Sequence, residues 1–417
     1  MIHKLQSDYR AHHSTETAVV KVLSNILQAL DSGNLAVLTL LDLSAAFDTV
    51  DHAILLRRLR VTYGIDGAVL KWFKSYLSGR TQFVRCGESK SAPTTLFCGV
   101  PQGSVLGPIL FLLYTADLLS LIEKHDLHPH LYADDTQIYG YCPPSDALRL
   151  QERVSKCVDE VEQWMRSNRL QLNTSKTEVL WCASDRRQHQ IPQSGLQIGA
   201  DVIAPSAAVR DLGIYLDADV SMTTHVSRVV SGCFAVLRQL RSIRQSVTRQ
   251  VFVSLVVSLV LSRLDYGNAT LAGITDKLFG RLQSVLNAAA RLINASSRTV
   301  HVTPLLHDLH WLRFPERVDY KLAVLVYRCL NGLAPSYLAD EFRRVSDMAS
   351  RQRLRSASTA NLDVPRFQRS TLGGRAFPVA ATRVWNNLPS RVTSSSSLST
   401  FKSKLKAELF QRSYYRD

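Results

Sequence analysis

An apolar run with an acid near its end constrains this chain more than any other single feature. Residues 35–43 read LAVLTLLDL, and Asp42 is the only charged residue among them. A nearly continuous apolar run bounded by turn residues is typical of a β-strand that is covered on both faces. A carboxylate at the end of such a strand loses hydration, and this costs free energy unless a cation or hydrogen-bond donor compensates for it. The run therefore predicts a buried strand whose terminal acid needs a partner.

The segments up to residue 217 alternate between helical and strand patterns. Helices are predicted over 14–33, 52–59, 69–77, 109–122 and 146–168, hairpins over 83–97 and 130–139, and strands into Trp181 and over 209–217. Residues 99–108 contain three Gly and two Pro and predict a tight loop, with Ser104 as the cap of the next helix. This order indicates an α+β fold.

The remainder has helical periodicity and a different charge. Helices are predicted over 226–243, 248–264, 274–293, 314–330 and 398–410, with Ser-rich stretches at 348–359 and 393–400. Residues 1–217 contain 21 Lys and Arg against 23 Asp and Glu, a net charge of −2, whereas the whole chain carries +15. The helical part therefore carries +17, which favours a polyanionic partner, although a solvated basic surface explains the charge equally well.

Several function classes are disfavoured. The seven cysteines are odd in number and include no C-x-x-C pair, so neither a disulfide framework nor a zinc ribbon is indicated. His301, His307 and His310 lack a nearby Cys partner and make a poor metal site. The apolar run 251–261 is shorter than the ~20 residues that cross a bilayer. We therefore expect a soluble intracellular protein without a membrane partner.

Asp134 and Asp135 are a second acidic feature, at the tip of the predicted hairpin 130–139. An isolated pair of this kind is most often an exposed turn pair. Converging carboxylates instead make an oxygen site that suits Mg²⁺, and two such ions about 3.5–4 Å apart serve in-line phosphoryl transfer. The separation of Asp42 from Asp134 along the chain permits this convergence.

At these residues the sequence resembles a known family. Residues 41–48 (LDLSAAFD), 99–110 (GVPQGSVLGPIL) and 132–135 (YADD) resemble motifs A, B and C of reverse transcriptases, in the family's order. The residues of these motifs, together with STET at 14–17, are similar to those of non-long-terminal-repeat (LINE-type) retrotransposons. Asn173 to Lys176 resembles motif D, and Leu212-Gly213 resembles motif E. The resemblance covers about residues 5–217 and, more loosely, the rest.

The resemblance implies a fold and an activity. It implies an α+β right-hand polymerase palm with partial fingers over residues 1–217, a helical basic thumb-like region over 218–345, and a basic C-terminal region with Ser-rich linkers over 346–417. The implied activity is RNA-directed DNA polymerisation, in which dNTPs are transferred onto a primer 3′-OH by a two-metal mechanism. RNA template, DNA primer and dNTPs are the implied partners.

The resemblance also implies roles for single residues. Asp42, Asp134 and Asp135 would lie beside two catalytic Mg²⁺ ions, for which Mn²⁺ can substitute. Phe47 would fill the space of a ribose 2′-OH and so favour deoxynucleotides, or else is plain core. The other implied positions are the backbone at Leu43 beside the triphosphate, Gln102 and Gly103 beside the nucleotide and template, Lys176 beside the leaving pyrophosphate, and Leu212 and Gly213 in the primer grip. Gln102 and Gly103 could instead make only a tight turn, and a lone exposed Lys176 would have no role.

The match departs from the family at its start. The sequence begins just ahead of the predicted helix 14–33, so we expect a truncated copy that lacks the family's first finger strands and their triphosphate contacts. This departure leaves a second hypothesis open, a catalytically silent nucleic-acid-binding remnant with a basic helical half. A polymerase that makes RNA is a weaker third alternative, because Phe47 and the YADD wording argue against it.

Overall fold

Two sets of segments, interleaved along the sequence, form separate units. The computed structural model describes residues 3–199, 201–347 and 361–415. Unit 1 comprises Met1–His13, Ala36–Trp181 and Gln190–Ser206, and unit 2 comprises Ser14–Leu35, Cys182–His189 and Ala207–Asp417. The predicted Ser-rich linker at 348–359 lies outside the described residues. The predicted functional domain boundaries after residues 217 and 345 stay a prediction.

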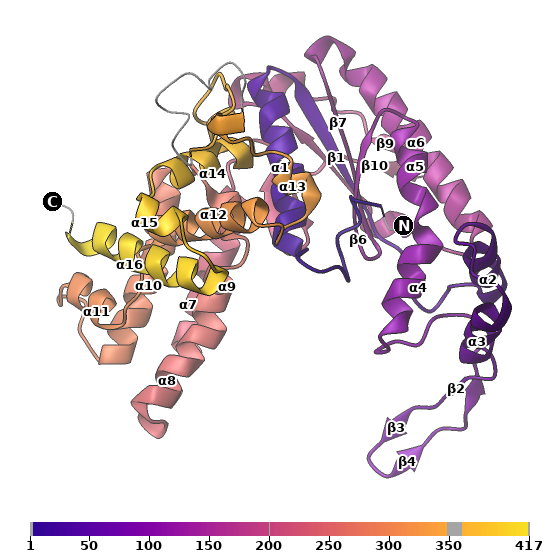
Figure 1. Cartoon of the computed structure of the whole chain (residues 1–417), viewed down its shortest axis with the longest axis horizontal. Helices are drawn as coiled ribbons and strands as arrows, with labels where there is room; N and C mark the ends of the chain where they lie inside the picture. Colours follow the sequence, from indigo (N-terminus) through magenta and orange to yellow (C-terminus); the bar gives the residue numbers. More distant parts are fainter. Residues whose placement is uncertain (1–2, 200, 348–360, 416–417) are drawn as a thin grey trace. The chain divides into compact units, whose positions relative to one another are not determined.

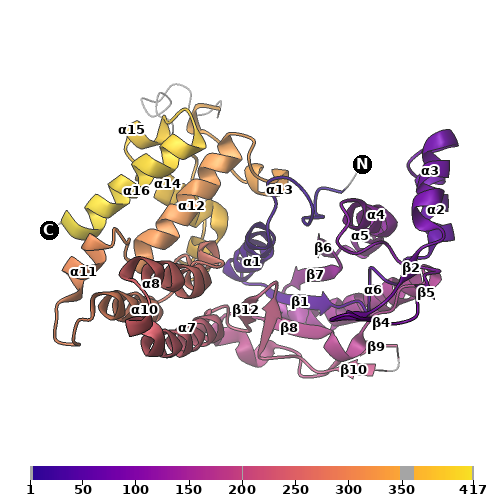
Figure 2. The same cartoon turned by 90° about the horizontal axis from the view of Figure 1, so that it is seen from below.

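Unit 1 is built on a four-stranded sheet. Its strands lie in the order β6 (His128–Tyr132), β7 (Asp135–Cys142), β1 (Leu35–Leu41) and β8 (Glu178–Cys182) (Figure 2). Six of the seven residues of β1 are buried, which confirms the predicted buried strand. Strands β6 and β7 form the predicted antiparallel hairpin, with Tyr132 opposite Asp135.

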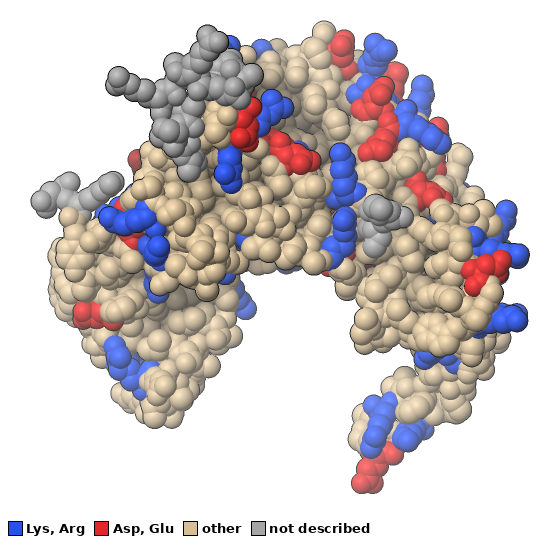
Figure 3. Space-filling view, in the orientation of Figure 1, with Lys and Arg blue, Asp and Glu red and all other residues tan. Residues whose placement is uncertain are grey.

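Helices and short strands complete unit 1 (Figure 1). The apolar stripe of α6 (Ala147–Ser167), from Leu150 to Met165, is buried and belongs to the core, as predicted. Basic side chains cover the arm formed by the predicted hairpin at 83–97, which contains only two-residue ladders (Figure 3). The remaining elements are α2 (His52–Val61), α3 (Gly67–Leu77), β2 (Thr81–Gln82), β3 (Arg85–Cys86), β4 (Ser89–Lys90), β5 (Thr94–Thr95), η1 (Pro144–Asp146), η2 (Thr174–Lys176), β9 (Leu196–Ile198) and β10 (Asp201–Ile203).

The apolar helix after the Gly-rich loop differs from its prediction. It begins at Leu106 and is divided into α4 (Leu106–Thr115) and α5 (Asp117–Glu123). The N-cap residue is Val105, so the predicted cap Ser104 lies one residue too early, although its Oγ accepts a hydrogen bond from the Gly107 amide at 2.9 Å. By length and composition alone, Leu106–Glu123 could cross a membrane, which the sequence analysis overlooked. Half of it is buried within the protein, as in the core helices of soluble proteins, so this is weak evidence for a span.

The described residues of unit 2 are mostly helical and include the β11–β12 hairpin. Residues 209–217, predicted as one strand, form two, β11 (Ala208–Asp211) and β12 (Ile214–Asp217), because Leu212 and Gly213 adopt positive φ and turn the chain back. The predicted helix 248–264 is one helical segment in three parts, with a π-helical turn at Val257–Leu261. The helical elements are α1 (Thr15–Asp31), η3 (Asp185–Gln190), α7 (Thr223–Ile243), η4 (Arg244–Ser246), α8 (Arg249–Val256), α9 (Ser262–Leu264), η6 (Asn268–Leu271), α10 (Asp276–Asn294), α11 (Val302–Asp308), α12 (Phe314–Leu330), α13 (Ser336–Ala339), η7 (Val345–Asp347), η9 (Gly373–Arg375), α14 (Phe377–Asn386), α15 (Ser390–Thr393) and α16 (Leu398–Tyr415).

The core of unit 2 surrounds α12, which packs against α14 and α16. The ring of Phe401 stacks on Tyr327 with centroids 4.4 Å apart and on Trp385 with centroids 5.7 Å apart. At the start of the unit, Ser14 caps α1, and the side chains of Ser14 and Thr17 each accept a hydrogen bond from the other residue's backbone N–H. The helical pattern predicted after residue 217 is confirmed for the described residues.

Candidate active site

The positions of the three predicted acids follow directly from how the sheet of unit 1 is built. Strand β1 ends at Leu41, so Asp42 is the first residue beyond its buried part. Asp134 lies in the turn of the β6–β7 hairpin, and Asp135 is the first residue of β7. Ala133 has a positive φ of 55°, which closes this tight turn. Because β7 and β1 are neighbours in the sheet, the acids come from adjacent strands.

The charges of neighbouring acids raise the pKa values of the two hairpin acids. Loss of hydration raises the pKa of Asp134, and the charges of Asp42 and Asp8 raise it further. Loss of hydration also raises the pKa of Asp135 to about 6, with added contributions from Asp134, Asp42 and Asp8. Repulsion between neighbouring carboxylates raises their pKa values and costs folding stability. Such an arrangement is therefore typical of functional sites.

Asp42 has two neighbours from the segment that precedes β8. Its Oδ2 lies 3.2 Å from Lys176 Nζ and 3.4 Å from Asn173 Nδ2. The backbone fixes this arrangement, because the Asn173 amide donates to Asp42 O at 2.9 Å and Leu43 forms a bridge with Leu172. The predicted motif D lysine thus contacts the motif A acid. The Leu43 side chain is buried.

The segments 41–52 and 98–104, which carry motifs A and B, are hydrogen-bonded to each other. The Val100 amide donates to Phe47 O at 2.9 Å, and the Gly99 amide donates to Val50 O at 2.8 Å. A Cβ on Gly99 would lie 2.9 Å from Asp48 O, and Gly99 has a φ of 88°, so only glycine fits there without strain. Gln102 Nε2 donates to Asp48 Oδ1 at 2.7 Å.

Phe47 and Gly103 have contrasting surroundings. The Phe47 ring is half-buried and stacks on Phe111 of α4, with centroids 4.6 Å apart and an interplanar angle of 30°. One face is therefore core, as one alternative predicted, and partial exposure also leaves room for a nucleotide-facing role. Gly103 is exposed, with a φ of 74°, and a Cβ there would meet nothing within 4 Å. Glycine at position 103 therefore serves the positive φ of the turn and not a close contact.

Leu212 and Gly213 belong to unit 2, whereas the three acids belong to unit 1. Leu212 and Gly213 form the turn of the β11–β12 hairpin. Tyr266 Oη donates to Leu212 O at 2.6 Å, and a Cβ on Gly213 would lie 3.2 Å from the Tyr266 ring. The turn is thus held against the segment that follows α9.

The sequence analysis missed Asp8. Residues 5–7 run beside β6, with the Ser7 amide donating to Leu131 O at 2.8 Å and the Leu131 amide donating to Leu5 O at 3.0 Å. This pairing carries Asp8 to the acid site, where its charge raises the pKa of both hairpin acids. Three paired residues are too few to produce a periodic pattern, so only the acid itself was visible in the sequence.

The donor chemistry at this site fits a hard divalent cation. Carboxylate oxygens are the ligands that Mg²⁺ favours, and a cation would relieve the repulsion that raises the pKa values of Asp134 and Asp135. Within residues 3–199, 201–347 and 361–415, however, no three His, Cys, Asp or Glu side chains are grouped as metal ligands. Instead, the Lys176 ammonium lies beside the Asp42 carboxylate.

Comparison with known proteins decides the family. The model of the family "Reverse transcriptase (RNA-dependent DNA polymerase)" matches residues 1–214, which include all three acids and the Leu212-Gly213 turn. The chain belongs to the reverse transcriptase family. This result confirms the resemblance, and the curated relatives are polymerases of non-long-terminal-repeat retrotransposons.

Two of the curated relatives come from Drosophila melanogaster. The chain is 28% identical over 356 residues to a probable RNA-directed DNA polymerase from transposon BS, covering 78% of this chain and 37% of that protein. It is 29% identical over 313 residues to a probable RNA-directed DNA polymerase from transposon X-element, covering 73% of this chain and 33% of that protein. The chain therefore spans about a third of the length of these relatives.

A solved telomerase structure from Candida albicans, in complex with a fragment of telomeric RNA, is also similar. It covers 76% of this chain and 51% of the telomerase chain at 12% identity, with a TM-score of 0.38. A score this low does not establish a shared arrangement of domains.

Proposed function

We propose that this chain carries the active site of an RNA-directed DNA polymerase that extends a primer 3′-OH with dNTPs on an RNA template. The observation that carries the proposal is the placement of Asp42 at the end of β1 and of Asp134 and Asp135 at the start of the neighbouring strand β7. Membership of the reverse transcriptase family supports the same reaction. We further propose that residues 1–217 are the palm with partial fingers, that residues 218–345 are a helical thumb-like region, and that residues 346–417 belong to a basic C-terminal region.

The acids are proposed to hold the metal ions. Asp42, Asp134 and Asp135 would bind two Mg²⁺ ions, or Mn²⁺ in their place. When bound, such ions activate the attacking hydroxyl and neutralise the charge of the leaving pyrophosphate. The carboxylates must be ionised to bind them, and mutual repulsion opposes this ionisation until a cation is present.

Other side chains of the site are proposed to position the substrates. Lys176 lies beside Asp42 and would supply a positive charge or a proton to the pyrophosphate. Gln102, which Asp48 holds by a hydrogen bond, and the neighbouring Gly103 would lie beside the nucleotide and template. The backbone at Leu43 would face the triphosphate. The Leu212-Gly213 turn would hold the primer end. Arginines on α7 and α10 would contact phosphates without reading sequence.

Primer extension tests the proposal. The full chain is incubated with poly(rA), oligo(dT), Mg²⁺ and dTTP, and extension is compared with that of Asp42→Ala and Asp134→Ala. Both substitutions should lower extension by at least ~100-fold, because each removes a charge that acts on the reacting groups. Glu152→Ala is the matched control, since Glu152 is an exposed acid on α6. If wild type shows no extension but still binds the primer–template, the remnant hypothesis replaces the polymerase.

Selection of the sugar tests the role of Phe47. Because Phe111 supports one face of its ring, Phe47 has a fixed position from which to exclude a 2′-OH. Phe47→Ala should raise incorporation of UTP relative to dTTP by roughly 10-fold or more while dTTP is still used. An unchanged ratio in an active variant would assign Phe47 to the core alone.

A further inference from the structure

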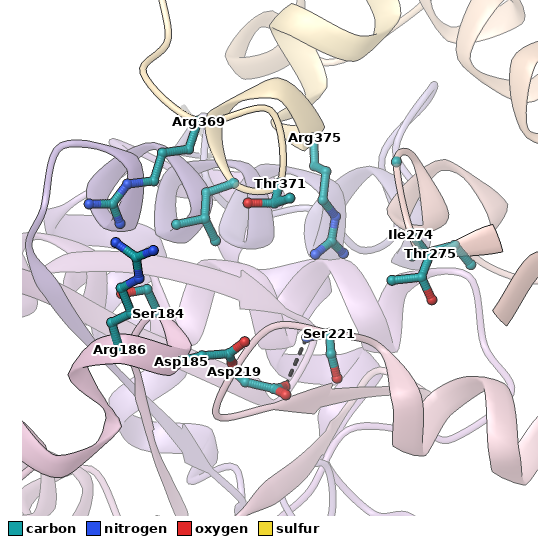
Figure 4. Close-up of a pocket in the computed structure, with 12 residues that line it drawn as sticks. Ser184, Asp185, Arg186, Asp219, Ser221, Ile274, Thr275, Arg369, Thr371 and Arg375 are labelled. Carbon is teal, nitrogen blue, oxygen red and sulfur yellow. Dashed lines mark hydrogen bonds between the residues drawn. The ribbon is translucent and has the colours of Figure 1, made fainter. Parts of the chain in front are cut away.

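A pocket in unit 2 has features of a binding site that the polymerase reaction does not use. Its volume is about 550 Å³. Four separate segments line it, namely the start of η3, the residues after β12, the residues before α10 and the segment 369–375 (Figure 4). All four belong to unit 2. The question is which ligand its side chains would bind.

A buried arginine forms one wall of the pocket. Arg375 is 8% exposed, and its guanidinium donates to Val220 O at 2.7 Å and to Ala272 O at 3.2 Å. Its Nη2 is buried and has no hydrogen-bond partner among the described residues. Burial lowers the pKa of Arg375 to about 10, so the group stays protonated at neutral pH. A buried cation with unused donors favours an anionic partner.

The backbone around this arginine is shaped to accept it. Gly273 has a φ of 64°, and a Cβ there would lie 2.7 Å from Arg375 Cγ, so glycine leaves room for the side chain. The adjoining segment is fixed by Asp31, which accepts from the amides of Gln368 and Arg369 at 2.7 Å each. These contacts hold the pocket wall in place without a ligand.

Two exposed arginines complete the positive side of the pocket. Arg186 and Arg369 both line it, and their guanidinium groups point toward one another in Figure 4. Neither side chain has an ion pair or hydrogen bond within the part of the chain that the structure describes. Two like charges directed at the same space repel each other, and an anion between them would remove that repulsion.

Two acids limit the charge that the pocket can neutralise. Asp219 accepts from the Ser221 amide at 2.9 Å, and Asp185 also lines the pocket. Against Arg186, Arg369 and Arg375, these acids leave a net charge of +1. This value matches a phosphodiester, which carries one negative charge, better than a free phosphate dianion. The volume also leaves room for more than the phosphate itself.

We propose that this pocket binds a phosphate group, held between Arg186 and Arg369 and facing Arg375. Arginine suits this role because its planar fork of donors matches phosphate oxygens. The phosphate could belong to a polynucleotide strand or be free in solution, and the charge balance favours the strand. The proposal is independent of the polymerase reaction, since the pocket contains none of the acids of the proposed active site.

Binding by the full chain distinguishes the two sources. The pocket variant is R186Q/R369Q, and the matched control is R298Q/R366Q, which removes two exposed arginines of unit 2 outside the pocket. The probes are a fluorescent 12-nucleotide single-stranded RNA and, separately, inorganic phosphate. If a strand supplies the phosphate, the pocket variant should bind RNA about 10-fold more weakly than the control variant. If free phosphate is the ligand, it should raise the melting temperature of wild type and control but not of the pocket variant.

A second measurement does not depend on how the variants fold. Phenylglyoxal modifies exposed arginines, and the modified positions are identified by mass spectrometry of the wild-type chain. Whichever probe binds should protect Arg186 and Arg369 while Arg298 and Arg366 still react. Equal weakening in both double variants, or equal protection at all four arginines, would overturn the proposal in favour of diffuse electrostatic attraction. Primer extension is measured separately, so failure here leaves the polymerase proposal untouched.

Discussion

A buried acid of unit 2 and the acids of the unit 1 site have opposite surroundings. In unit 1, Asp134 and Asp135 lie among other acids, and repulsion adds to burial in raising their pKa values. In unit 2, Glu408 is 8% exposed and lies 2.6 Å from Arg391 and 3.0 Å from Arg412. Two cations therefore neutralise this buried acid of unit 2, whereas the acid site of unit 1 keeps like charges together at one place.

This difference separates a stabilising arrangement from a functional one. Glu16 follows the unit 2 pattern, since it is buried beside Lys321 at 2.6 Å and also accepts from the Ala269 amide at 3.2 Å. Among Asp8, Asp42, Asp134 and Asp135, only Asp42 forms an ion pair within the described residues, with Lys176, and that lysine is itself largely exposed. Folding alone gives no reason to collect acids in this way, so their convergence points to a ligand that unit 1 is built to bind.

The largest expected effect is in unit 2. Glu408→Gln should lower the free energy of unfolding by about 3 kcal/mol, because it leaves Arg412 and Arg391 without their carboxylate. Hydrogen exchange in urea measures the free energy of unfolding for each unit. Glu162→Gln is the control, since its partner Arg166 is 73% exposed, and it should cost less than about 0.5 kcal/mol. Equal losses would remove the contrast between buried and exposed pairs.

A pH titration should reveal a second buried group of unit 2. His225 is 2% exposed, and burial lowers its pKa to about 4. The unfolded state then binds a proton more readily, so stability present above pH 6.5 is lost as the pH falls toward 4, by about 3 kcal/mol in total. His225→Gln should reduce this loss, as followed by chemical unfolding at several pH values. The same slope in both proteins would show that other groups cause the acid sensitivity.

Patterns that repeat along the sequence predicted the structure well. The run at 35–43 and the stripe of α6 each contain enough apolar positions to define a strand or a helix, and α12 begins and ends where its periodicity does. The acids could be predicted because they sit at the ends of such elements. The family resemblance then supplied roles that spacing alone leaves open.

Features that depend on one or two residues, or on distant partners, could not be predicted. The reversal at Leu212-Gly213 was read as a glycine within a strand, because the apolar residues on both sides continue a strand pattern. Asp8 reaches the acid site through two backbone hydrogen bonds to Leu131, and Arg375 is buried only because segments from four parts of the chain meet there. Such contacts come from tertiary packing and leave no local period.

The backbone of unit 1 provides the next test, since the acids need a fixed frame. Gly99→Ala should lower the free energy of unfolding by about 2 kcal/mol, because its Cβ would meet Asp48 O and the backbone has a positive φ. Gly103→Ala is the matched control. It has a similar φ but open space around its Cβ, so about 1 kcal/mol is expected. Urea unfolding of both variants separates collision from backbone strain.

The smallest effect has the opposite sign and bears most directly on the comparison. Asp134→Asn keeps the shape of the side chain but removes one of the mutually repelling charges, whose repulsion by Asp42 and Asp8 contributes to the raised pKa of Asp134. We expect unit 1 to become more stable at pH 7, by up to about 1 kcal/mol given partial solvent screening. Primer extension should be lost in the same variant, since the amide cannot replace the carboxylate.

Hydrogen exchange in urea without added divalent cations measures the gain in stability. The control is Asp117→Asn, which removes an exposed acid of unit 1 that pairs with Arg58 at 2.6 Å and should slightly destabilise the unit. A stability gain together with lost extension would show that repulsion among the acids is retained for activity. A stability loss in Asp134→Asn would instead mean that its carboxylate supports the fold, and the contrast between the two units would fail.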